Sequence, residues 1–238
     1  MNRFFVENIG PQEAVIEGED LKHLSSVLRL RRGDRVMLSD GRGSECEGEI
    51  EHVEPVRARV RTGPWRPCLS EPHHKLTVFQ CLPKAGKMET IIQKCTELGM
   101  NALAPTLSAR CVVQPGRDFD RKLQRYRKVA REAAMQSGRG LIPEVLPLVE
   151  LGKADLSIFD TVYCAYEGER EQTLKARMAR RPGRRIALFI GPEGGFEPEE
   201  VQSLVARGAQ VVSLGPRILR TETAGMAMVA QILFELDE

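Results

Sequence analysis

The chain has 238 residues, of which 42% are hydrophobic, so it can bury one large core or two modest ones. Its 35 basic and 33 acidic residues give a net charge of only +2, which excludes uniform attraction to nucleic acid but leaves local basic patches open. The first residues have no apolar signal core, and no apolar run approaches membrane-spanning length, so we predict a soluble, cytoplasmic protein.

Short alternating segments predominate in residues 1–68 and predict a small β-barrel-like domain. Residues 20–28 are the one helical candidate there, with leucines on one face. Three prolines within residues 63–72 interrupt regular structure and predict an interdomain linker. Strands are expected at 35–39, 44–53 and 56–61, with a hairpin turn at 40–43.

Residues 69–238 alternate between strand-like and helix-like segments, which predicts a parallel sheet covered by helices on both faces. Strands are expected at 76–82, 102–107, 162–166, 186–190 and 211–214. Helices are expected at 87–98, 119–136, 169–180, 199–206 and from Thr221 onward.

A strand, a glycine-rich turn and a helix start follow one another in residues 186–200, an order typical of nucleotide-binding loops. Glu193 in the turn and Glu167 at a neighbouring strand end would repel a pyrophosphate, and the Gly-x-Gly-x-x-Gly spacing is absent. A ligand with an adenosine and a sulfonium cation, as in S-adenosylmethionine, fits better. A tight turn with a helix-capping acid explains the same residues, and both interpretations stay open at this point.

The last stretch of the chain places polar residues at the entry of an apolar helix. Arg217 and Arg220 flank an apolar pair, and residues 221–223 (Thr-Glu-Thr) open the helix. A helix that is apolar on nearly every side is expected to be buried all round. Burying polar groups against such a core costs free energy, which suggests that they have a function. A simple N-cap role accounts for the threonines.

Two motifs in this region, "IGPEGGF" (190–196) and "LGPRILRTETA" (214–224), resemble the paired cofactor signatures of the RsmE-type 16S ribosomal RNA (uracil-N3)-methyltransferases, a SPOUT-class family. The resemblance departs from the family pattern at Met135, where an acidic residue is expected. It extends over the whole chain through "MNRFFV" (1–6), "HLSSVLRLRRGD" (23–34), "KMETIIQKCTELG" (87–99) and "QSGR" (136–139).

The resemblance implies an α/β fold: a SPOUT-like parallel sheet with a C-terminal trefoil knot, plus an N-terminal PUA-like small β-barrel domain. It implies a PUA-like RNA-binding domain at 1–68 and a methyltransferase domain with a cofactor-binding knot at 69–238. S-adenosylmethionine is the implied cofactor, 16S ribosomal RNA or the small ribosomal subunit the partner, and a homodimer the assembly. No metal is expected, because no zinc-like ligand pairs flank the histidines at 73–74.

The site residues follow from these motifs. Arg220 is the candidate for stabilising charge on the uracil, and Glu222 is a possible proton acceptor or a helix-start carboxylate. The expected cofactor-binding residues are Tyr166, Glu167, Ile190, Gly191, Pro192, Glu193, Gly194, Gly195, Leu214, Gly215, Ile218, Leu219, Thr223 and Ala224. The expected RNA-binding residues are Arg3, Arg29, Arg31, Arg121, Arg125, Lys128, Gln136 and Arg139.

Two other classes of function remain as alternatives. A non-catalytic RNA-binding assembly factor could keep the same fold, but the intact cofactor motifs argue against it. A dinucleotide-dependent oxidoreductase lacks its glycine fingerprint.

Overall fold

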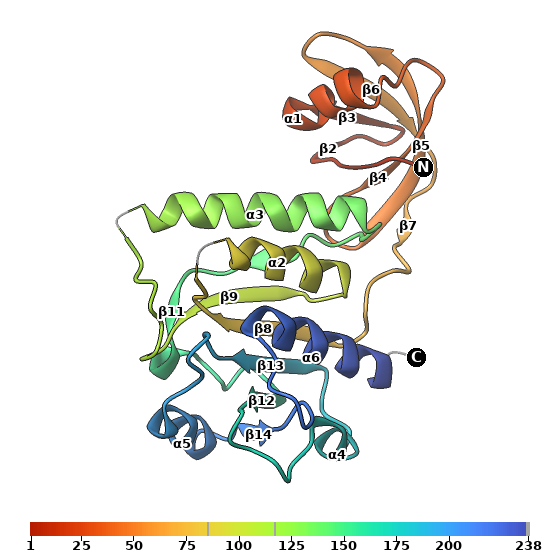
Figure 1. Cartoon of the computed structure of the whole chain (residues 1–238). Coiled ribbons are helices and arrows are strands. Elements are labelled where there is room, and N and C mark those ends of the chain that lie inside the picture. The colour runs from red at the N-terminus through yellow and green to blue at the C-terminus, as the bar shows by residue number, and fades with distance from the viewer. Residues whose placement is uncertain (85, 117, 237–238) are drawn as a thin grey trace. The chain divides into compact units, whose positions relative to one another are not determined.

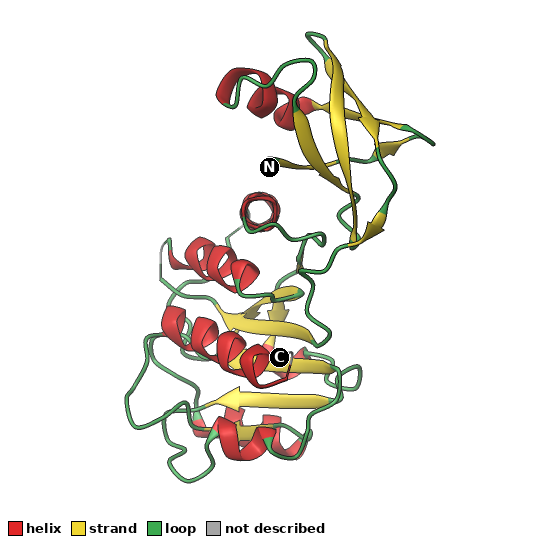
Figure 2. Cartoon of the chain, turned by 90° about the vertical axis from the view of Figure 1, so that its right-hand side faces the viewer, coloured by secondary structure: helices red, strands yellow, loops and turns green. Residues whose placement is uncertain are grey.

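The structure is a computed structural model that describes residues 1–84, 86–116 and 118–236. The chain folds into two compact units. Unit 1 comprises Met1–Glu71 and Ala134–Ile142, and unit 2 comprises Pro72–Ala133 and Pro143–Glu238. Figure 1 labels the elements, and Figure 2 shows that strands predominate in unit 1, whereas helices accompany the strands of unit 2.

Unit 1 is built around a mixed sheet. Its strands are β1 (Arg3–Phe5), β2 (Asn8–Ile9), β3 (Glu13–Glu17), β4 (Arg35–Ser39), β5 (Ser44–Val53), β6 (Arg57–Thr62) and β7 (Arg66–Pro67). They pair in the order β1-β4-β5-β6-β3-β2, with β7 on β5. β1 is parallel to β4, and the other pairs are antiparallel. The predicted strands at 35–39 and 44–53 are confirmed, and the third lies one residue further along than predicted.

The predicted helix at 20–28 is present, but it changes geometry along its length. It starts as α1 (Gly18–Lys22) and continues as a π-helical turn, η1 (His23–Val27). The N–H of Leu28 donates to the carbonyl of His23, five residues back, at 2.9 Å. Leu21 and Leu24 are buried in the core of unit 1, as the sequence pattern predicts.

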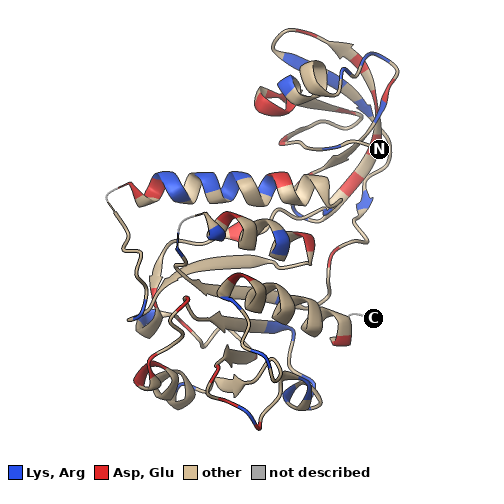
Figure 3. Ribbon diagram, viewed as in Figure 1, with Lys and Arg blue, Asp and Glu red and all other residues tan. Residues whose placement is uncertain are grey.

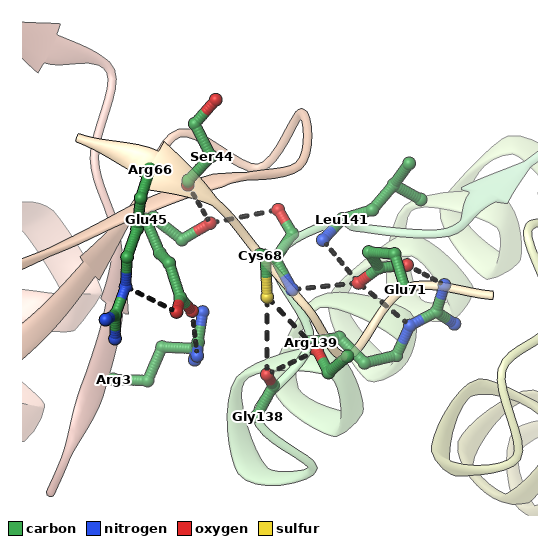
Figure 4. Close-up of polar contacts among 12 residues, drawn as sticks. Arg3, Ser44, Glu45, Arg66, Cys68, Glu71, Gly138, Arg139 and Leu141 are labelled. Atoms are coloured by element: carbon green, nitrogen blue, oxygen red, sulfur yellow. Dashed lines mark hydrogen bonds and ion pairs between the residues drawn. The ribbon is translucent and has the colours of Figure 1, made fainter. Parts of the chain in front are cut away.

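The segment Ala134–Ile142 belongs to unit 1 although about 60 residues separate it from the rest of that unit. The guanidinium of Arg139, which is 3% exposed, pairs with Glu71 at 2.7 Å (Figure 4). Glu71 also accepts hydrogen bonds from the N–H groups of Gly140 and Leu141, at 2.8 and 2.9 Å. A buried ion pair is favourable only when its remaining groups are satisfied, and these donors satisfy the carboxylate. The segment is therefore an integral part of unit 1.

Unit 2 holds a parallel sheet, as predicted. Its strands are β8 (Lys75–Cys81), β9 (Ala102–Leu107), β10 (Glu144–Val145), β11 (Val149–Glu150), β12 (Thr161–Ala165), β13 (Arg185–Ile190) and β14 (Gln210–Val212). They pair in the order β10-β9-β8-β13-β12-β14, with β11 on β9. The helices are α2 (Lys87–Glu97), α3 (Phe119–Gln136), the 3-10 turn η2 (Leu151–Lys153), α4 (Leu174–Met178), α5 (Pro198–Ala206) and α6 (Thr221–Leu236).

Helices cover the central strands of this sheet. Every residue from Ile186 to Ile190 is buried, so both faces of β13 are covered. α6 packs against β8, β13 and α2, and α5 packs against β14. The last residues of α3 fall within unit 1.

One predicted helix is much shorter than expected. The sequence pattern predicts a helix over 169–180, but only α4 forms. The carboxylate of Glu169 accepts hydrogen bonds from the N–H groups of Glu171 and Gln172, and this local turn competes with the helix. Thr173 then caps the helix start by accepting from the N–H of Ala176 at 3.2 Å.

Candidate cofactor site at the ends of the parallel strands

Four parallel strands of unit 2 end side by side. Ile190 of β13 is in register with Gln80 of β8 and with Ala165 of β12, which is in register with Val212 of β14. The chain leaves three of these strand ends in the loops Tyr166–Gly168, Gly191–Gly195 and Leu214–Arg220. The carboxyl ends of parallel strands are where open α/β sheets bind ligands. The structure therefore places the predicted cofactor residues in these loops or on the elements that flank them.

The glycine turn has a backbone that a side chain would disturb. Gly195 has a positive φ of 69°, and its N–H donates to the carbonyl of Pro192 at 3.0 Å. A Cβ on Gly195 would overlap the carboxylate of Glu167, so the loop after β12 lies against the turn after β13. Glycine at this position therefore allows both the turn conformation and the close approach of the two loops.

A lysine from α2 connects the glycine turn to the start of α6. The Nζ of Lys87 lies 3.0 Å from a carboxylate oxygen of Glu193 and 3.0 Å from one of Glu222. Glu193 also accepts from the backbone N–H of Lys84 at 3.1 Å. Lys87 opens the segment 87–99, but its role in the site was not predicted, because Glu193 and Glu222 lie 106 and 135 residues away in the chain.

The contacts of Glu222 stabilise the ionised form of its carboxylate. Its own backbone N–H lowers its pKa, burial opposes this, and Lys87 lowers it further. A paired carboxylate with a lowered pKa is a weak proton acceptor. The geometry therefore favours a charge role for Glu222 at the start of α6 over proton transfer.

A chain of buried hydrogen bonds connects the glycine turn to β8 and to the start of α6. Gln80, which is fully buried, donates from Nε2 to the hydroxyl of Thr221 at 2.8 Å. Thr221 in turn donates to the carbonyl of Gly191 at 2.6 Å. The end of β8, the start of α6 and the turn after β13 are thereby tied together. This chain gives Thr221 a reason to lie over a core beyond simple helix capping.

Arg110 supports the other side of the turn. Its guanidinium donates to the carbonyl of Gly194 at 2.8 Å and to the carboxylate of Glu197 at 2.8 Å. The hydrogen bond to Glu197 raises the pKa of Arg110 above its usual value. Arg110 stands outside the segments that carry the family resemblance, so its role was not predicted from the sequence.

The third loop is exposed in part, whereas its Leu214 and Leu219 pack against the core of unit 2. Ile218 is 86% exposed, and Arg220 is exposed as well. Gly215 has a positive φ of 116°, which turns the chain back after β14. Arg220, the predicted stabilising cation, is therefore free to meet a substrate from solvent.

The charges at this edge match a cationic ligand better than a phosphate. Glu167, Glu193 and Glu222 bring three carboxylates together, and Lys87 is shared between two of them. A pyrophosphate would meet this negative charge, whereas a sulfonium would be attracted to it. The residues present therefore fit S-adenosylmethionine.

We expect Lys87→Met to weaken S-adenosylmethionine binding roughly tenfold, because it leaves Glu193 and Glu222 to repel each other. Lys87→Arg keeps the charge and should retain most of the affinity. Titration calorimetry measures both. Lys94→Met, which removes a cation of the same helix that pairs with Glu97, is the control. Similar losses in the Lys87→Met and Lys94→Met variants would contradict a specific role of Lys87.

The predicted RNA-binding residues divide into exposed and buried ones. Arg139 pairs with Glu71, and Arg3 pairs with Glu45 at 2.7 Å with its side chain 11% exposed. Burial and pairing favour structural roles for these two arginines over phosphate contacts. The other six side chains are exposed: Arg29, Arg31, Arg121, Arg125, Lys128 and Gln136.

Two negative findings limit the site. Within residues 1–84, 86–116 and 118–236, no group of three His, Cys, Asp or Glu side chains could hold a metal ion. None of the helices in these residues is long and apolar enough to span a membrane.

The parallel sheet, its glycine turn and its carboxylates are those of a protein that binds a nucleoside cofactor. Two family models match the chain: an RNA methyltransferase domain over residues 70–233 and an RNA methyltransferase PUA domain over residues 16–61. The chain therefore belongs to this family of RNA methyltransferases, which confirms the resemblance seen in the sequence.

Individual relatives agree with this assignment. The chain is 33% identical to the ribosomal RNA small subunit methyltransferase E of Bacillus subtilis, over 100% of this chain and 98% of the relative. It is 34% identical to the Mycobacterium bovis protein of the same name, over 92% of this chain and 85% of that one. It also matches the crystal structure of ribosomal RNA small subunit methyltransferase E from Neisseria gonorrhoeae bound to S-adenosylmethionine, with a TM-score of 0.88, 31% identity and 99% and 98% coverage.

Proposed function

We propose that this protein transfers a methyl group from S-adenosylmethionine to N3 of a uridine in the 16S ribosomal RNA of the small subunit. The observation that carries the proposal is the set of three loops at one sheet edge, where glycines and carboxylates suit an adenosyl sulfonium. Family membership and the names of the relatives support ribosomal RNA as the substrate.

The chemistry assigns roles to the residues at this edge. N3 of uridine lies on the pairing edge of the base, so the base must leave its stack to react. The cofactor supplies an electrophilic methyl group, and N3 loses its proton as negative charge grows on the uracil oxygens. The exposed guanidinium of Arg220 would stabilise that charge. Glu222 and Lys87 would hold the start of α6 in place.

We further propose that the C-terminal segment forms a trefoil knot around the cofactor loops. The chain leaves β14 at the edge of the sheet and returns in α6 to pack against β13 and β8. The hydrogen bonds from Gln80 through Thr221 to Gly191 support this proposal, because they bring three separated segments together. A knot of this kind would be an exception to the rule that chains avoid threading loops.

We assign RNA binding to residues 1–68 and methyl transfer to residues 69–238. The exposed Arg29 and Arg31 support RNA contact in the first part, and the basic face of α3 supports it in the second. Phosphate contacts of this kind position RNA without specifying a base.

Two measurements test the proposed function. Titration calorimetry with S-adenosylmethionine separates the enzyme from a non-catalytic assembly factor, which would not bind the cofactor. Methyl transfer to small subunits that lack the modification, followed by mapping of the methylated base, tests N3 of uridine. Cofactor binding without any transfer to ribosomal RNA would contradict the proposal.

We expect a homodimer with α6 at the interface, because a large apolar side chain of this helix is left exposed. Phe234 is 67% exposed. Sedimentation at micromolar concentration should give a dimer for the parent and a monomer for Phe234→Glu. Val205→Glu is the matched control, since Val205 is 48% exposed on α5. A parent monomer with full activity would refute the dimer.

A further inference from the structure

A short stretch of unit 2 carries a run of positive charge that contains no acidic residue. Residues 174–185 contain six of the 35 basic residues of the chain and none of the 33 acidic ones, so the rest of the chain is net negative. Figure 3 shows the blue of this charge on α4. The six are Lys175, Arg177, Arg180, Arg181, Arg184 and Arg185. We call residues 174–185 the basic edge.

A nearby carboxylate, that of Asp160, is used to build the loop. Asp160 accepts from the backbone N–H of Arg185 at 2.8 Å and from its guanidinium at 3.1 Å. The backbone hydrogen bond from Arg185 lowers the pKa of Asp160, and the guanidinium of Arg185 lowers it further. Gly183 lies so close to Asp160 that a Cβ there would overlap its side chain. Asp160 therefore fixes the end of the basic edge and neutralises only Arg185.

The remaining exposed cations are left uncompensated. Lys175, Arg180, Arg181 and Arg184 are exposed and form no ion pair with any residue that the structure describes. Like charges this close repel one another, and a bound polyanion would relieve that repulsion.

The basic face of α3 differs in this respect. Arg125 pairs with Glu89 at 2.7 Å, and Arg127 donates to the carbonyl of Val145 at 3.3 Å. Lys128 lies 4.0 Å from Glu132. Several cations of α3 are therefore already engaged, so the basic edge offers more free positive charge than the helix that the sequence analysis selected.

The two ends of the basic edge lie at different ends of the sheet. The N–H of Leu174 donates to the carbonyl of Ser213 at 3.0 Å, so the start of the basic edge adjoins the third cofactor loop. Arg185 is the first residue of β13, and Gly191 follows its last residue. Six residues of strand at about 3.3 Å each separate them by roughly 20 Å. RNA that lies along the basic edge would therefore extend several nucleotides away from the reacting base.

We propose that the basic edge binds the phosphate backbone of the RNA substrate at a distance from the methylated nucleotide. This inference rests on the proposed function. The contacts would be to phosphates and would add affinity and orientation, not base specificity.

The test neutralises three cations that have no structural task in the described residues. The variant Lys175→Gln/Arg180→Gln/Arg184→Gln leaves Arg185 on Asp160 and leaves the left-handed backbone of Arg181 (φ 49°) untouched. The control Arg57→Gln/Lys94→Gln/Lys153→Gln removes the same charge from three ion pairs with a glutamate three residues away. Binding of transcribed 16S ribosomal RNA is measured at several salt concentrations for both variants and the parent.

We expect the basic-edge variant to bind RNA at least about tenfold more weakly, with the slope of log affinity against log salt shallower by up to about two units. Its affinity for S-adenosylmethionine should equal that of the parent. An unchanged slope, or an equal change in the control, overturns the proposal. Normal binding of RNA with lost binding to the assembled subunit would point instead to a ribosomal protein and also overturns it. If the parent transfers no methyl group, the proposed function is contradicted. The RNA-binding measurement decides the role of the basic edge independently of that result.

Discussion

Gly195→Val is expected to reduce S-adenosylmethionine affinity by at least about 100-fold, about 3 kcal/mol at 1.4 kcal/mol per tenfold. The positive φ of Gly195 disfavours a β-branched residue, and any Cβ there displaces Glu167. The carboxylate of Glu167 would have to move away from the glycine turn, and the turn itself would be strained. Titration calorimetry measures the loss, and circular dichroism verifies that the fold persists.

Two other glycines serve as controls for this result. Gly208 also has a positive φ, of 94°, but no atom lies within 4 Å of a Cβ built there. Gly208→Val therefore carries the backbone strain without the crowding and should bind the cofactor normally. Gly194→Val meets Arg110 only at 3.4 Å and should show an intermediate loss. Parent-like titration by Gly195→Val would show that the pocket lies elsewhere.

Arg220→Ala is expected to lower the turnover number by roughly 10²–10³ and to leave the affinity for S-adenosylmethionine nearly unchanged. Arg220 is exposed at the end of the third loop, and in the proposed reaction its guanidinium stabilises the charge that develops on the uracil oxygens. Single-turnover methylation of small-subunit RNA measures the chemical step, and calorimetry measures the cofactor affinity.

Arg217→Ala is the matched control, because Arg217 is an exposed arginine of the same loop. It should change turnover little. Arg220→Lys keeps the charge and should recover part of the lost rate. Equal losses of cofactor affinity and turnover in Arg220→Ala would make Arg220 a cofactor ligand or a structural residue instead.

Most of the regular elements could be predicted from local patterns. The strand runs at 102–107 and 186–190 and the helix at 119–136 are long and periodic, and the structure confirms them. The strands β1, β2 and β3 were not predicted; β1 and β2 have three and two residues, too few to show a periodic pattern. The helix at 169–180 was overestimated, because a local bond pattern from Glu169 breaks it.

The residues of the candidate site also differ in whether a local sequence pattern could predict them. The loops could be predicted because glycines and strand ends leave a signature in consecutive residues. Lys87, Arg110 and Gln80 could not, since each acts through partners 80 to 140 residues away. The buried ion pair of Arg139 could not be predicted either. An arginine in a short loop is expected to be exposed, and its partner Glu71 is distant in the sequence.

The compact units also bear on how the domains can be tested. The sequence suggests a division at residues 68–69, whereas unit 1 of the structure includes Ala134–Ile142. Met135 packs against the core of unit 1. A truncated protein beginning near Ser70 would leave Met135 without that core. Point variants such as Arg29→Gln are therefore the cleaner test of RNA binding by the first domain.

The split composition of unit 1 has a consequence during synthesis. The unit lacks Arg139 and the carbonyl of Gly140, which accepts from the hydroxyl of Ser39 at 2.9 Å, until the ribosome has made about 70 residues beyond Glu71. At roughly 5–20 residues per second this wait lasts on the order of several seconds. During that time Glu71 lacks its cation and the sheet lacks part of its cover. The N-terminal sheet, although synthesised first, would therefore reach its final form only after residues 72–133 of unit 2 have been synthesised.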